Sequence, residues 1–96
     1  MQVSFKVFGE LATVSGQSEL TVEVADGTDV RGLLDAVDRQ TGRSVSTSVL
    51  FDTGTVLPSL AVLLNGNNIL LGSGLKSSLK PGDRVTVMPM ISGGRI

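Results

Sequence analysis

Residues 28–42, TDVRGLLDAVDRQTG, form the segment on which the fold of this chain depends. Its main apolar positions follow the spacing i, i+3, i+4, i+7 of a single helical stripe: Val30, Leu33, Leu34 and Val37. Thr28 or Asp29 can cap the first turn, and Gly42 can end the last one. Gly32 costs stability inside a helix, so its presence indicates a close approach to a sheet. The segment therefore predicts one helix of about three turns that packs on a sheet.

Strand patterns flank this helix on both sides. Alternating apolar residues predict strands at 3–7 and 20–24, joined by a loop that includes Gly9 and residues 14–18. After the helix, the predicted elements are a central strand at 60–64, a tight turn at Asn65-Gly66, a short edge strand at 68–71, a turn at 80–83 and a last strand that reaches Pro89. Residues 43–59 are predicted to be a loop, with Val49-Leu50-Phe51 as a short strand or a buried anchor.

The element order indicates the fold class. A helix between two pairs of strands must cover one face of a mixed sheet to bury its apolar stripe. We therefore predict an α+β domain of the β-grasp (ubiquitin-like) type, with a mixed sheet of four to five strands and one main helix. The predicted domain covers residues 1–90, and residues 91–96 are predicted to be a flexible carboxyl-terminal tail.

Composition excludes or disfavours several classes of function. The 96-residue chain contains no cysteine and no histidine, which removes thiolate chemistry, the commonest general base and the commonest metal ligands. A net charge of −1 and scattered basic residues disfavour nucleic-acid binding. The longest apolar run, residues 60–64, is too short to span a bilayer, and we expect a cytoplasmic protein. An enzyme is the least favoured class, because the remaining side chains form no recognisable catalytic group.

The carboxyl end carries the most specific motif. Residues 80–94, KPGDRVTVMPMISGG, combine a Pro-Gly-Asp turn, a strand and the pair Gly93-Gly94. This stretch resembles the close of MoaD/ThiS-type sulfur carriers, the ubiquitin-like family that also includes small protein modifiers. The segments 62–66 (VLLNG) and 8–12 (FGELA) are similar to other parts of the same family. The resemblance thus covers nearly the whole chain, although only the last part is specific.

The resemblance implies a function for the tail. In the family, the carboxylate of the last glycine is adenylated by a ubiquitin-activating-type enzyme that uses ATP. It then becomes a thiocarboxylate or is linked to lysines of target proteins through an isopeptide bond. Here Arg95-Ile96 follow Gly94, so the resemblance implies a precursor that a peptidase, such as a JAMM-type metalloprotease, processes after Gly94. The chain itself is expected to bind no cofactor and no metal.

Strand alternation also predicts a surface for partners. It places Leu63 and Met88 on the sheet face away from the helix, and Phe8 and Met90 can join them there. An exposed face with adaptable methionines suits docking of several enzymes. The alternative is that the loop at 43–59 folds over and covers this face. Asp35 and Asp38, three residues apart on the helix, are interpreted as part of a solvated face and not as a paired carboxylate site.

Two other functions are compatible with the same fold. One is a small structural subunit that inserts its tail into a large synthase subunit, as in molybdopterin synthase. The other is a non-conjugating β-grasp interaction module from which Arg95-Ile96 are never removed.

Overall fold

The structure is a computed structural model that describes residues 1–50 and 54–89. Its elements, in chain order, are β1 (Gln2–Val7), α1 (Glu10–Ser15), β2 (Glu19–Glu23), α2 (Val30–Thr41), α3 (Val45–Val49), β3 (Leu60–Leu64), β4 (Asn67–Asn68), the 3₁₀ turns η1 (Ile69–Leu71) and η2 (Gly74–Lys76), and β5 (Arg84–Pro89).

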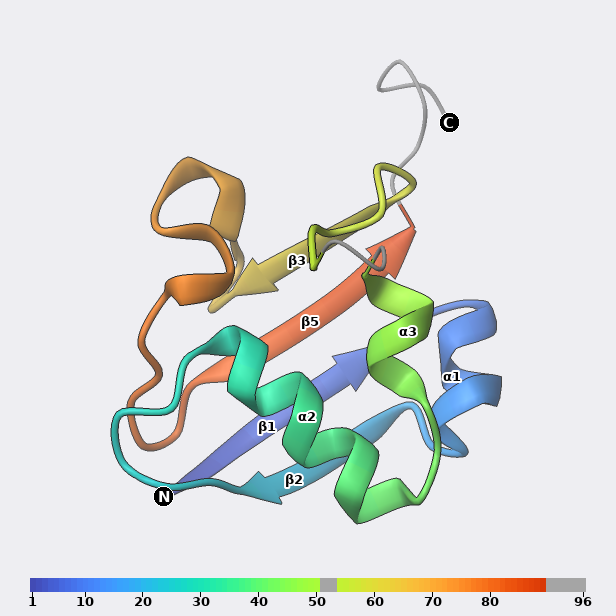
Figure 1. Cartoon of the computed structure of the whole chain (residues 1–96), viewed down its shortest axis with the longest axis horizontal. Helices are drawn as coiled ribbons and strands as arrows, with labels where there is room; N and C mark the ends of the chain where they lie inside the picture. Colours follow the sequence, from blue (N-terminus) through green and yellow to red (C-terminus); the bar gives the residue numbers. More distant parts are fainter. Residues whose placement is uncertain (51–53, 90–96) are drawn as a thin grey trace.

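The strands form one mixed sheet in the order β2-β1-β5-β3-β4. β1 and β5 are parallel, with Phe5 opposite Val85, and the other neighbouring pairs are antiparallel. The last strand of the described chain therefore lies in the middle of the sheet, between β1 and β3 (Figure 1). This arrangement confirms the predicted α+β class and the β-grasp topology.

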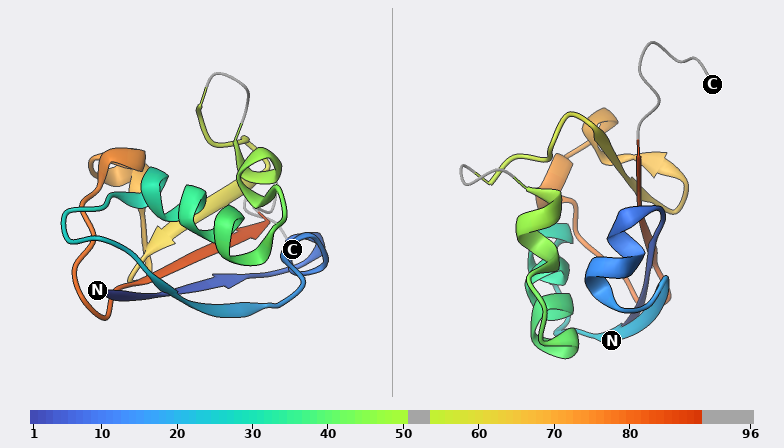
Figure 2. Two further views of the ribbon diagram at one scale, coloured as in Figure 1. Left: turned by 60° about the horizontal axis from the view of Figure 1, so that its bottom comes forward. Right: turned by 90° about the vertical axis from the view of Figure 1, so that its right-hand side faces the viewer.

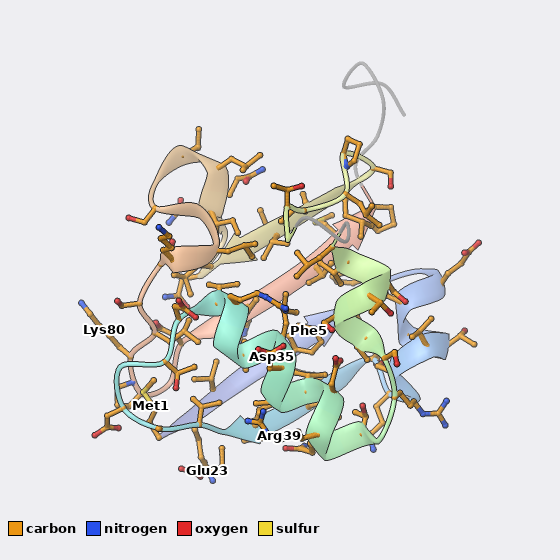
Figure 3. The ribbon with its side chains drawn as sticks, in the orientation of Figure 1. Met1, Phe5, Glu23, Asp35, Arg39 and Lys80 are labelled. Carbon is orange, nitrogen blue, oxygen red and sulfur yellow. The ribbon has the colours of Figure 1, made fainter. Side chains whose placement is uncertain are left out.

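The helices α2 and α3 cover one face of the sheet, and α1 lies at the end of the sheet beside the end of β1 (Figure 2). The core lies between this helical layer and the inward-facing strand residues. Phe5 is its largest side chain in the described part of the chain; it is fully buried and lies behind the helices in Figure 3. Leu33, Leu34 and Val37 of α2 are also fully buried, as the predicted apolar stripe requires.

The start of α2 is fixed by side chains of the preceding loop. Asp29 is the N-cap, and its Oδ1 accepts a hydrogen bond of 2.8 Å from the Gly32 amide. The Thr28 hydroxyl donates to the Ala25 carbonyl over 2.6 Å. A Cβ added at Gly32 would lie 2.8 Å from Thr28 Cγ2 and 3.3 Å from Asp29 Oδ1. The glycine thus accommodates the capping loop, and the prediction that it marks a close approach to the sheet is wrong.

This crowding gives a testable consequence. Gly→Ala in a helix normally stabilises a protein by about 0.5–1 kcal/mol. We expect Gly32→Ala instead to destabilise the fold by about 1 kcal/mol, because the new methyl group displaces Thr28 and disturbs the cap. Thr28→Ser keeps the hydroxyl and removes the clashing methyl group, so the double variant should regain that loss. Urea unfolding of both single variants and the double variant measures the coupling; a stabilising effect of Gly32→Ala alone would contradict this account.

The two short helices were not predicted from the sequence. Residues 43–59 were predicted to be a loop, yet α3 occupies part of this stretch, with Val45 and Val49 fully buried. Asp38 of α2 caps it, because its carboxylate accepts from the Ser46 amide at 2.8 Å and from the Ser46 hydroxyl at 2.5 Å. Leu50, the predicted anchor, is buried and forms an isolated bridge with Val56. Phe51 lies outside the described residues.

The connection between β1 and β2 also differs from the prediction. Instead of a loop, it contains α1, which buries Leu11 and Ser15 one turn apart and is followed by Gly16 as its C-cap. The segment has no side-chain N-cap, since Gly9 precedes it. Because α1 has no capping side chain, we attribute its helical conformation mainly to burial of the Leu11 side chain.

The turns before β4 and before β5 occur where the sequence predicts them. Asn65 and Gly66 both have positive φ values, 52° and 87°, as a tight hairpin turn requires. The Asn65 side chain donates to Asp83 Oδ1 over 3.0 Å and accepts from the Arg84 amide over 2.9 Å, which joins the two turns. The predicted edge strand at 68–71 is only partly correct, because β4 is Asn67–Asn68 and η1 follows it directly.

The amino end is attached to the edge strand β2. The Met1 amino group donates to Glu23 Oε2 at 2.8 Å and to the Val24 carbonyl at 2.7 Å (Figure 3). The hydrogen bond that this amino group donates to Glu23 stabilises its charged form and raises its pKa above the ordinary value of 8.0. These contacts hold the start of β1 against β2. Because β1 and β5 are parallel, the start of β1 lies at the opposite end of the sheet from Pro89, where β5 ends.

Candidate functional site

The predicted working residues Gly93 and Gly94, the extension Arg95-Ile96 and the docking residue Met90 lie outside the described residues. The structure does show where the chain leaves the sheet. Pro89, the last described residue, ends the central strand β5 and pairs with Leu60 at the start of β3. The site described below is therefore the set of residues that surround Pro89.

Gly9 fixes the end of β5 against the segment that follows β1. The Phe8 amide donates to the Val87 carbonyl over 3.1 Å, which continues the contact between β1 and β5. Gly9 then adopts φ 67° and ψ −141°, a conformation that is essentially restricted to glycine. A Cβ at this position would lie 3.3 Å from Pro89 Cγ. Gly9 thus allows both a sharp change of chain direction and the close approach of Pro89.

Gly9→Ala should therefore disturb the start of the tail as well as the fold. We expect a loss of about 1–3 kcal/mol in the free energy of unfolding from backbone strain. The matched control is Gly27→Ala, because Gly27 has φ 87° but an added Cβ would meet no atom within 4 Å. Both variants should lose stability in urea unfolding, but only Gly9→Ala should shift the NMR amide resonances of residues 90–92. Equal shifts in the two variants would contradict a special role of Gly9.

The predicted docking residues that the structure describes share one sheet face. Leu63 lies opposite Thr86, and Met88 lies opposite Ala61, all on the face away from α2. Phe8 follows β1 beside Met88 and is 42% exposed. We name Phe8, Ala61, Leu63 and Met88 the outer patch. The Lys6 ammonium group lies 5.1 Å from the centroid of the Phe8 ring, at the border of this patch.

The sequence left open the alternative that residues 43–59 fold over the outer patch, and α3 is the helix that lies within this range. α3 contacts α1 and α2, so this part of the segment lies on the helical side of the sheet. Figure 2 shows α2 and α3 on the same side. Among the described residues, no helix covers the outer patch.

A surface groove of about 580 Å³ lies on the other side of the tail exit. Its lining comes from α1, α3, the segment before β3 and the end of β5: Phe8, Gly9, Glu10, Leu11, Val14, Ser48, Leu57, Ser59, Leu60 and Pro89. Most of this surface is apolar, and Glu10 is its one charged residue. The sequence did not predict this groove, because it depends on the two short helices that periodicity missed.

The carboxylates of α2 have structural roles. Asp38 caps α3, and Asp35 forms an ion pair of 3.1 Å with Arg31 on the same helix. Asp35 pairs with Arg31 on the surface of α2, as expected for a solvated face, whereas Asp38 is half-buried against α3, which the sequence interpretation did not foresee. Across the described residues, no group of three acidic side chains is placed to hold a metal ion. Within the same residues, no helix is long and apolar enough to cross a membrane.

Comparison with known protein families assigns the chain to a family. The model of the ThiS family matches residues 5–94, a range that begins in β1 and includes both glycines of the tail. The chain belongs to the ThiS family. The matched range covers both the sheet and the segment that follows it.

Individual relatives support the same assignment. A protein of Archaeoglobus fulgidus with the name "Putative sulfur carrier protein" is 27% identical over 81% of this chain and 86% of its own length. Small archaeal modifier protein 3 of Haloferax volcanii is 28% identical over 98% of this chain and 100% of its own. The crystal structure of SAMP1 from Haloferax volcanii superposes with a TM-score of 0.78 and 28% identity, covering 98% of this chain and 100% of that one. This ThiS-family chain is thus related to proteins named as a sulfur carrier and as small archaeal modifiers.

Proposed function

We propose that this ThiS-family chain is a precursor whose reactive group is the carboxylate of Gly94, released when a peptidase removes Arg95-Ile96. The single observation that supports this most is the position of β5. The central strand of the sheet ends at Pro89, only four residues before Gly93. A rigid strand thus presents a short diglycine segment, which lacks side chains and can enter a narrow active site.

The chemistry requires this order of steps. While Arg95 is attached, the Gly94 carbonyl belongs to a peptide bond, which is a poor electrophile. Hydrolysis of that bond gives a carboxylate, and a ubiquitin-activating-type enzyme joins it to AMP from ATP with release of pyrophosphate. A sulfur nucleophile then displaces AMP to give a thiocarboxylate, or a lysine amine of a target protein displaces the activated group to give an isopeptide bond.

The outer patch is the proposed docking surface for the activating enzyme. It adjoins the tail exit, because Met88 lies one residue before Pro89 and Phe8 contacts the same end of β5 through its amide. An enzyme that binds Phe8, Leu63 and Met88 would hold the tail at a fixed distance from its nucleotide site. Burial of such side chains contributes about 1.5–3 kcal/mol each at full desolvation.

The remaining parts of the proposal concern partners and place. A JAMM-type metalloprotease is the proposed processing enzyme, since its class acts on bonds after diglycine motifs of ubiquitin-like proteins. The activation uses ATP bound by the partner, and this chain supplies only the carboxylate. We place the process in the cytoplasm.

The intact mass of the protein isolated from its native cells tests this proposal. Loss of the combined mass of Arg95 and Ile96 is expected, and a fraction should carry the further increase caused by replacing one oxygen with sulfur. Treatment with iodoacetamide should alkylate the thiocarboxylate sulfur of that fraction. Because the chain has no cysteine, the alkylation would identify the thiocarboxylate. A single species that retains Ile96 would contradict processing and would favour the non-conjugating interaction module.

A further inference from the structure

The strand β2 presents a long open edge of the sheet. It is the outermost strand of the order β2-β1-β5-β3-β4, whereas β4 at the opposite edge has only two residues (Figure 1). The Val24 amide donates to the Met1 carbonyl over 2.9 Å, which continues the ladder between β2 and β1. In an antiparallel ladder alternate residues bond to the same neighbour. The residues between them therefore point their amides and carbonyls to the open side: Glu19, Thr21 and Glu23.

An exposed side chain of α2 covers the middle of this edge. The Gln40 side-chain amide donates to the Thr21 carbonyl over 3.0 Å. In the part of the chain that the structure describes, the backbone groups of Glu19, Thr21 and Glu23 make no other hydrogen bond on the open side. β2 also contains no proline and no bulge, two features that commonly protect an edge strand. Gln40 is exposed and can leave its acceptor, so it covers the edge reversibly.

Two surface grooves flank the contact between Gln40 and Thr21. The groove of about 620 Å³ is lined by residues that include Glu23 and Arg39, and the groove of about 300 Å³ by residues that include Leu20 and Gln40. Each groove has walls from α2 and from β2 or the residues next to it. Figure 3 shows Glu23 and Arg39 at the same edge of the molecule. An added strand would therefore find space for the side chains that it points toward α2.

The charges on β2 indicate which kind of segment fits its edge. Glu19 and Glu23 are exposed on the sheet face away from α2, on either side of Thr21. Among the ion pairs of the described residues, none involves Glu19, because Lys6 opposite it lies over the Phe8 ring instead. The Glu23 side chain pairs with the amino terminus and is still 70% exposed. Both carboxylates are therefore accessible to cationic side chains of an added strand.

The same charges disfavour a second copy of this chain as the occupant. If two β2 strands paired antiparallel about Thr21, Glu19 of each chain would lie opposite Glu23 of the other. Like charges that are directly opposite each other on neighbouring strands are destabilising. A strand with basic residues at those positions would instead gain two attractive pairs.

We propose that the β2 edge binds an extended, basic segment of a partner protein, which displaces Gln40 and joins the sheet as an additional strand. Backbone hydrogen bonds to β2 hold the segment, and lysine or arginine side chains opposite Glu19 and Glu23 select it. Because β1 separates β2 from β5, the bound segment leaves Pro89 accessible. The inference goes beyond the proposed function, and no part of it depends on processing or activation of the tail.

Titration with the peptide acetyl-Lys-Val-Thr-Val-Lys-amide, followed by NMR, tests the proposal, since its lysines have the spacing of Glu19 and Glu23. The amides of Glu19, Thr21 and Glu23 should shift and exchange more slowly with solvent when the peptide is bound. The amide of Val22, which points to β1, should keep its exchange rate. Shifts scattered over acidic residues without protection at β2 would overturn the proposal, because they indicate non-specific attraction. Protection that grows with protein concentration in the absence of peptide would overturn it in favour of a second copy.

A charge exchange tests the selection of basic residues. Glu19→Lys should weaken binding of this peptide by about threefold to tenfold. Of two further peptides, each with one lysine replaced by glutamate, one should bind the variant more tightly than it binds the native chain, and its identity gives the direction of the added strand. Glu10→Lys, an exposed charge reversal on α1, is the matched control and should leave affinity within about twofold. Equal weakening in both variants would contradict recognition at the edge.

Two variants test the backbone contacts. Gln40→Ala should tighten binding by about twofold to fivefold, because the peptide no longer has to displace the glutamine. Thr21→Pro removes the amide that points to the open side and leaves the bonds between β2 and β1 in place, as proline on an edge strand allows. It should weaken binding by about twofold to tenfold, and urea unfolding measures whether the fold is retained. Unchanged affinity in the Gln40→Ala chain would by itself contradict displacement of Gln40.

Discussion

If the chain is processed and activated as proposed, replacing Met88 with Asp is expected to weaken its activation by the adenylating enzyme by about 30-fold, equivalent to about 2 kcal/mol. Met88 lies in the outer patch beside the tail exit, so a carboxylate there would be buried without a partner in the complex. The loss should appear as a higher KM for this protein in ATP–pyrophosphate exchange. The free energy of unfolding should change much less, since Met88 is not part of the buried core.

A matched control separates docking from charge in general. Thr21→Asp introduces the same charge on the edge strand β2, at an exposed position remote from Pro89. We expect this variant to be activated within about twofold of the native chain, because surface charges outside an interface have small effects. Leu63→Asp, inside the patch, should reproduce the effect of Met88→Asp. Native kinetics in both patch variants would mean that the enzyme recognises the tail alone.

The second large effect concerns the core. Phe5→Ala should lower the free energy of unfolding by about 3–5 kcal/mol, since it removes a fully buried aromatic ring from the strand that pairs with β5. For a domain whose total stability is about 5–15 kcal/mol, this is a major fraction. Urea unfolding followed by far-ultraviolet circular dichroism measures it.

Phe5→Leu is the control for this variant, because it retains most of the apolar volume. Its cost should stay near 1.5 kcal/mol, within the range of shape-conserving core changes. If Phe5→Ala cost no more than Phe5→Leu, the core around β1 would be much less tightly packed than its complete burial indicates.

The long-range architecture was predictable because it depends on strong periodic patterns. The helical stripe of α2, the alternation in β1 and β2 and the apolar run of β3 each indicate one element, and together they permit few topologies. The turns at Asn65-Gly66 and at 80–83 carry residues that positive φ values demand. These signals are local, so they are visible without knowledge of the tertiary structure.

The short helices were missed because their stability is not local. α3 has the sequence VSTSV, in which every residue is a poor helix former, and it depends on burial of two valines and on the cap from Asp38. Asp38 is seven residues before the helix it caps, beyond the reach of any local capping pattern. The groove at the tail exit depends on the same two helices, so it was equally invisible in the sequence.

The candidate site was predicted in part for a related reason. Leu63 and Met88 are assigned to the outer face by alternation alone, and the register confirms that they share it. Gly9 looks like any loop glycine in the sequence. Its contact with Pro89 joins residues far apart in the chain, and only the fold brings them together.

The placement of β5 between β1 and β3 has a mechanical consequence. If the tail is joined to another protein, an unfolding machine that pulls on the conjugate pulls β5 along its own axis. β5 is hydrogen-bonded to β1 on one side and to β3 on the other, and the parallel strand β1 begins at the end of the sheet opposite to Pro89 (Figure 1). A force along β5 therefore loads the hydrogen bonds to both neighbouring strands in shear at the same time, instead of opening them one by one. The linked domain should therefore stay folded under a pulling force that unfolds a less resistant target protein. It could then be released from the machine intact and be conjugated again.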